Sequence, residues 1–214
     1  LVLGSVAPVV AKPEKTPQVL DPSSLFVPDI TDVQFESALS TDVVTASSLP
    51  EVTPFWVDLV NKENVENDGE GVYVAVLDTG LLPLWPFFFS QANIASNLGK
   101  GFTHDLYWDE EAQDIMAGPL KEDRGFITDL ASGHGTHVTS TIVGYHFSTI
   151  YNNFWVEGVA PKVTIIPVLV LDAWEVEVPG EDGPVTRQVS GGTDEMVSAG
   201  IYYIADLAES LDGP

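Results

Sequence analysis

Two short segments of this 214-residue chain carry side chains that could perform chemistry together. Asp78 follows the apolar run Val74–Leu77, and His134 lies between Gly133 and Gly135 further along the chain. A carboxylate can accept a hydrogen bond from histidine Nδ1, which fixes the tautomer of the ring and leaves Nε2 able to take a proton. A histidine that titrates near neutral pH suits the role of general base for a serine hydroxyl. The pair therefore supplies two thirds of an Asp-His-Ser triad, and the nucleophilic third is not evident in the sequence.

Other interpretations of these residues stay open on the sequence alone. An aspartate after a strand usually caps a helix or a turn, and a glycine-flanked histidine is structural more often than catalytic. His134 and His137, three residues apart, could ligate a metal with Asp78 as third ligand, although no general-base carboxylate lies nearby in the segment. Asp78-Thr79-Gly80 also fits the signature of aspartic proteases. That chemistry needs a second such triplet or a symmetric dimer, and the secondary-structure pattern does not suit it.

The elements that must position Asp78 and His134 form an alternating series. Val72–Leu77 is a continuous apolar run typical of a strand covered on both faces. Gly135–Gly144 has helical spacing, and Val163–Leu171 is a second apolar strand in which Pro167 predicts a bulge or a local break. Thr193–Ser210 is the clearest helix, with Thr193 as its N-cap. This series predicts an α/β fold with a mostly parallel sheet and helices on both faces.

The segments around this series are less regular. Residues 1–54 are rich in Pro, Ser and Thr, and we interpret them as an irregular N-terminal arm or a pro-region remnant. Leu81–Phe89 holds two prolines that argue against a regular helix, so we expect a core-packing loop. Gly101–Leu106 is a candidate strand. We expect the charged segments Asp105–Asp129 and Asp172–Gly192 to be surface loops.

Composition excludes several functions. Lys and Arg number 8 against 32 Asp and Glu, which gives a net charge of −24 and disfavours binding to nucleic acid or to anionic membranes. The chain has no cysteine, so a thiol nucleophile, a disulfide and a zinc-thiolate site are excluded. No apolar run approaches the length of about 18–20 residues that a membrane span needs.

Taken together, the two chemical segments resemble those of the subtilisin-like serine proteases (subtilases). In that family an apolar strand ends in Asp-Ser/Thr-Gly, as here at Asp78, and the segment His-Gly-Thr-His-Val stands here at His134–Val138. The resemblance implies that Asp78 and His134 are catalytic and that His137 is a supporting, non-catalytic residue. Gly158–Pro161, followed by an apolar strand, continues the family pattern. The resemblance covers residues 55–214 and implies the N-terminal half of a subtilisin-like catalytic domain, incomplete in this chain.

The departures from the family shape the expected function. The family's oxyanion Asn and its Gly-Thr-Ser-Met-Ala nucleophile segment are absent, so we expect the isolated chain to be inert. The resemblance implies a serine endopeptidase acting on polypeptides, with the Ser supplied by the C-terminal remainder of the same protease. The enlarged segment Asp172–Gly192 stands where the family borders its S2 and S4 subsites. Thr139-Ser140 replaces the usual Ala-Gly after the histidine motif.

Three further expectations rest on the same resemblance. The alternative function is a non-catalytic, subtilase-like scaffold or interaction module of an extracellular assembly. The expected location is extracellular or at the cell surface, where a cell-surface protein is a candidate partner. No cofactor is expected for catalysis, but the family often carries structural calcium. Tyr151-Asn152-Asn153 stands where the family has a calcium loop, and we assign no ligand.

Overall fold

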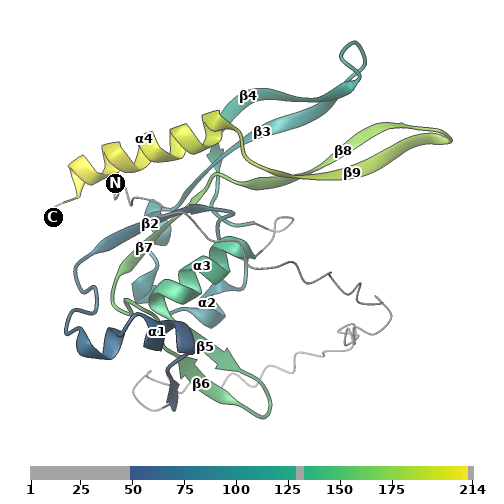
Figure 1. The fold of residues 1–214 in the computed structure, drawn as a ribbon. Helices are drawn as coiled ribbons and strands as arrows, with labels where there is room; N and C mark the ends of the chain where they lie inside the picture. Colours follow the sequence, from purple (N-terminus) through teal and green to yellow (C-terminus); the bar gives the residue numbers. More distant parts are fainter. Residues whose placement is uncertain (1–48, 129–132, 212–214) are drawn as a thin grey trace, which may run out of the picture. The chain divides into compact units, whose positions relative to one another are not determined.

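A mixed four-stranded sheet forms the centre of the protein. The structure is a computed structural model that describes residues 49–128 and 133–211. The strands lie in the order β2-β7-β3-β4 (Figure 1). Strands β2 (Tyr73–Asp78), β7 (Thr164–Leu169) and β3 (Lys100–Asp109) are parallel, and β4 (Asp114–Arg124) pairs with β3 in the antiparallel direction. The predicted α/β class with a mostly parallel sheet is confirmed.

Two helices cover opposite faces of this sheet. Helix α3 (His134–Val143) packs on one face and α4 (Asp194–Ser210) on the other. Side chains alternate between the two faces along a strand, so β2 and β7 contribute to both cores. The α3 core contains Val76, Ile165, Val138, Ile142 and Val143, and the α4 core contains Ile166, Val168, Val170, Met196 and Leu207.

The ends of both helices follow the predictions. Helix α3 ends at Gly144, whose φ of 78° is a conformation that glycine adopts readily. Before α4, the Oγ1 atom of Thr193 accepts a hydrogen bond from the backbone N–H of Met196. Asp194 and Glu195 lie in the first turn of α4, where negative charge is favourable.

The prediction that residues 105–129 and 172–192 are surface loops is wrong. The strand expected at Gly101–Leu106 continues to Asp109 and returns as β4, and the second segment forms β8 (Asp172–Gly180) and β9 (Gly183–Gly191). The signal in β8 was alternation: Val176 and Val178 are each 3% exposed, and the intervening Glu177 is exposed. Most of the acidic residues of these segments are exposed on the strands or in the hairpin turns, whereas Asp172 is buried. The two hairpins lie side by side (Figure 1), with β3 in contact with β8.

The predicted break at Pro167 is also absent, because β2 and β7 pair without interruption, with Pro167 opposite Val76. The backbone N–H of Thr164 donates to the carbonyl oxygen of Val72, just before β2, and that of Val170 donates to Asp78 at the end of β2. Even-numbered residues of β7 therefore present their N–H groups to β2, and Pro167 faces the other edge, where β3 starts to pair opposite Val168. The missing N–H of proline thus removes no hydrogen bond between β2 and β7.

A smaller sheet and several short helices complete the described residues. The sheet has the order β1-β6-β5. The core-packing prediction for residues 81–89 holds only at the ends, because Leu81 and Phe89 are buried whereas Leu84 and Phe87 are exposed. A four-residue helix forms within this segment, with Pro86 in its first turn, where proline is tolerated. Strand β1 falls within the segment predicted to be irregular, and residues 1–48 of that segment lie outside the described residues. The remaining elements are β1 (Glu51–Val52), α1 (Phe55–Leu59), α2 (Trp85–Phe88), β5 (Tyr145–Ser148), β6 (Asn153–Val156) and the 3-10 helices Lys62–Asn64, Gln91–Asn93 and Ser96–Leu98.

Among the described residues, none of the helices has the length and apolar character needed to cross a membrane.

Candidate active site

Asp78 is the last residue of β2 and lies at the carboxyl edge of the parallel strands. Open α/β sheets place their ligand sites outside this edge. The backbone of Asp78 is held by the neighbouring strand, because its carbonyl oxygen accepts hydrogen bonds from the N–H groups of Val170 (2.9 Å) and Leu171 (3.1 Å). Its side chain is 12% exposed.

The structure brings Asp78 and His134 together. The Nδ1 atom of His134, the first residue of α3, lies 2.8 Å from both carboxylate oxygens of Asp78. With Nδ1 protonated, the ring donates to the carboxylate and Nε2 carries the lone pair that can accept a proton. The His134 side chain is 60% exposed, so it is accessible from solvent while its partner is largely buried. This is the geometry expected for an acid-base pair.

Thr79 and Thr136 hold the two segments against each other, a role that the motifs alone do not indicate. The Oγ1 atom of Thr79 accepts a hydrogen bond from the N–H of Gly135 (2.9 Å), and Oγ1 of Thr136 accepts one from the N–H of Leu82 (2.9 Å). In addition, the N–H of Thr79 donates to Oδ1 of Asp78 (2.7 Å). The signal in the sequence that could have indicated this role is that each of the two short motifs contains a threonine.

Two glycines permit the close approach of these segments. A Cβ atom at Gly135 would lie 2.3 Å from the carbonyl oxygen of Gly80 and 3.2 Å from Oδ1 of Asp78. Gly80 has a φ of 75°, and a Cβ there would lie 2.0 Å from the carbonyl oxygen of Phe126. Any larger residue would force the backbone segments apart. The glycines therefore set the distance between the strand end and the helix start.

His137 takes no part in the pair. It is exposed on α3 and lines a pocket of about 250 Å³ together with Trp56, Leu82 and Phe88. Among the described residues, no group of three His, Cys, Asp or Glu side chains is placed to hold a metal ion, so the metal-site alternative gains no support.

Several oxygens in and beside the turn at Tyr151-Asn152-Asn153, where the family has a calcium loop, already make hydrogen bonds within the chain. Oγ1 of Thr149 accepts from the N–H groups of Tyr151 and Asn152, and the carbonyl oxygen of Asn152 accepts from the N–H of Thr149. Oδ1 of Asn153 contacts Nε2 of His146. Calcium prefers six to eight oxygen ligands with carboxylates among them, and this turn offers no carboxylate. The turn therefore gives no support to a calcium site, and structural calcium stays a prediction.

Comparison with known proteins gives one match. The family model described as the subtilase family matches residues 69–209, a range that contains both Asp78 and His134. A search of curated proteins finds no match, and a search of solved structures also finds none.

Proposed function

Because the chain belongs to the subtilase family of serine peptidases, we propose that it supplies Asp78 and His134 to the Asp-His-Ser triad of a serine endopeptidase. One observation carries the proposal: Nδ1 of His134 lies 2.8 Å from the buried carboxylate of Asp78, while the ring is 60% exposed. A purely structural histidine at a helix start would not require a largely buried carboxylate as its partner.

Each residue has a defined role in the proposed reaction. Nε2 of His134 removes the proton from a serine hydroxyl as Oγ bonds to the scissile carbonyl carbon of a polypeptide. The Asp78 carboxylate stabilises the imidazolium ion that forms and keeps its orientation. His134 then gives the proton to the leaving amine as the peptide C–N bond breaks. A water molecule then attacks the acyl-enzyme in the same way: His134 takes the proton from the water and returns it to the serine oxygen as the ester bond breaks.

The serine and the oxyanion donor come from a segment outside these 214 residues. The sequence contains no Gly-Thr-Ser segment of the family type. The partner is therefore the remainder of the same protease, and we expect the isolated 214 residues to hydrolyse no peptide. An extracellular or cell-surface location is part of the proposal, because members of this family are commonly secreted. Fractionation of the natural host tests it, and recovery only inside the cell would contradict it.

A fluorophosphonate, which reacts with activated serines, tests the proposed triad in the intact natural protein. We expect His134→Ala and Asp78→Asn to reduce the labelling rate by about 10⁴-fold or more, as loss of triad members does. His137→Ala is the matched control on the same helix and should label at the wild-type rate. Labelling that persists in His134→Ala would refute the triad. No labelling of the wild-type protein would favour the scaffold function.

A further inference from the structure

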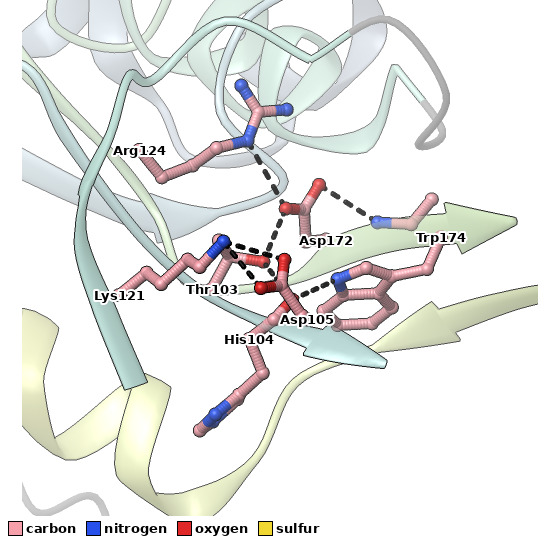
Figure 2. Close-up of polar contacts among 8 residues, drawn as sticks. Thr103, His104, Asp105, Lys121, Arg124, Asp172 and Trp174 are labelled. Carbon is pink, nitrogen blue, oxygen red and sulfur yellow. Dashed lines mark hydrogen bonds and ion pairs between the residues drawn. The ribbon is translucent and has the colours of Figure 1, made fainter. Parts of the chain in front are cut away.

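We propose that Asp172 is a positioning residue for Asp78, which it acts on through its ion pair with Arg124 (Figure 2). The positioning itself is a property of the folded chain. Its consequence for peptide hydrolysis rests on the function proposed above. The pair joins two backbone segments that hold Asp78 and the residues after it from two sides.

The first segment follows β7. The N–H groups of Val170 and Leu171 donate to the carbonyl oxygen of Asp78, and Asp172 is the next residue. Any displacement of Asp172 is therefore transmitted through one peptide unit to the donors that fix the Asp78 backbone.

The second segment follows β4. The carbonyl oxygen of Phe126 accepts from the N–H of Leu81 (2.9 Å), and the N–H of Thr128 donates to the carbonyl oxygen of Leu81 (2.9 Å). This segment therefore fixes the residues just beyond Asp78, and it passes so close to Gly80 that a Cβ there could not fit. Arg124 lies two residues before Phe126.

The Asp172 carboxylate connects the two segments in a buried position. Asp172 is 5% exposed, and its Oδ2 accepts from Oγ1 of Thr103 (2.8 Å) and from Nε of Arg124 (3.3 Å). Its Oδ1 accepts from the N–H of Ala173 (2.9 Å). A buried carboxylate that accepts three hydrogen bonds, one of them from a guanidinium group, has a restricted position.

A neighbouring ion pair provides an internal comparison. Lys121 and Asp105 form an ion pair in the same region (Figure 2), but their side chains are 47% and 72% exposed. Exposed pairs of this kind contribute little, and this one touches neither segment that holds Asp78. Asp172 and Asp105 are both paired with a basic residue of β4, but they differ in burial and in the segments that they contact.

The test follows the proton between His134 and Asp78 in the intact natural protein. A proton on Nδ1 that is hydrogen-bonded to a carboxylate gives an NMR signal downfield of the amides, and its exchange with water reports opening of the pair. We expect Asp172→Asn, which removes the charge and places an amide group next to Ala173 N–H or Arg124, to accelerate this exchange about tenfold. Arg124→Gln should have the same effect, and the proton should exchange no faster in the double variant than in either single variant.

Asp105→Asn is the matched control and should leave the exchange rate unchanged. The amide proton of Val168, fully buried in β7, reports global unfolding. Faster exchange of the Nδ1 proton of His134 without faster exchange of the Val168 amide proton supports the proposal. An unchanged rate in Asp172→Asn, or equal acceleration of both protons, overturns it. If Asp172→Asn does not fold, Thr103→Val removes one hydrogen bond to the same carboxylate and should accelerate exchange about threefold.

The labelling rate separates this inference from the proposed function. If the wild-type protein reacts with a fluorophosphonate, Asp172→Asn should react about tenfold more slowly and Asp105→Asn at the wild-type rate. If the wild-type protein does not react, the proposed function fails, and the proton exchange still decides the role of Asp172.

Discussion

Replacing Gly135 with alanine sets two opposing effects against each other. Alanine in place of glycine favours a helix by about 1 kcal/mol, so helix propensity alone predicts a more stable protein. The added Cβ, however, would lie 2.3 Å from the carbonyl oxygen of Gly80, whereas ordinary contacts begin at 3.4 Å. The start of α3 must therefore move by about 1 Å away from β2. Overpacking costs about 1–3 kcal/mol, and a contact with backbone, which cannot rotate away, lies at the upper end of this range.

The net loss is about 2 kcal/mol, which corresponds to a Tm about 4–8 °C lower for a chain of this size. The displacement also separates His134 from Asp78, and a misplacement of about 1 Å can reduce the reaction rate about 10²-fold. Calorimetry and the rate of fluorophosphonate labelling of the intact natural protein measure the two effects. Gly125→Ala is the control, because no heavy atom lies within 4 Å of its added Cβ. A Gly135→Ala variant that melts at or above the wild-type Tm and labels within threefold of its rate would refute this reasoning.

Two further predictions concern stability. Thr193→Ala removes the hydrogen bond to the N–H of Met196 and a partner of Nε2 of His104, so urea unfolding should show a loss of about 1–2 kcal/mol that Thr193→Ser largely restores. The hydrogen bond from Lys62 lowers the pKa of Glu157 below its usual 4.5, with a smaller contribution from Thr53. The stability that the Glu157 carboxylate contributes is therefore complete above pH 4.5 and is lost as pH falls through the lower native pKa. Glu157→Gln should weaken the pH dependence of Tm below pH 4.5 and leave the pH dependence near pH 7 unchanged.

The contact between Asp78 and His134 was predictable from the sequence because the two motifs together resemble those of the subtilases. The hydrophobic pattern alone places Asp78 at the end of a buried strand and His134 at the start of a helix, and it leaves their partner open. The hairpins β3–β4 and β8–β9 were missed for a definite reason. Their many Glu and Asp residues favour a surface loop by composition, although in Trp174–Val178 charged and apolar residues alternate with the period of a strand.

The pairing of Arg124 with Asp172 could not be predicted from the sequence, because it depends on both hairpins. Arg124 ends β4 and Asp172 begins β8, so neither residue has a defined position until these strands are recognised. Thr103 and the indole N–H of Trp174, which donates to the carbonyl oxygen of His104, then fix β8 against β3. Such contacts join residues about 70 positions apart without a local pattern.

The two hairpins extend from the sheet at the edge where Asp78 lies, so a change in a hairpin can affect the active site. Strand β3 runs parallel to β7 and continues past it into the first hairpin, and β8 begins three residues after β7 ends. Both hairpins therefore extend from the carboxyl edge, the edge at which Asp78 lies. An insertion at the opposite edge could vary without disturbing the acid-base pair, but insertions at this edge share backbone with the segments that hold it. The partly buried ion pair at their bases is thus where a change in the hairpins would reach the backbone segments that hold Asp78.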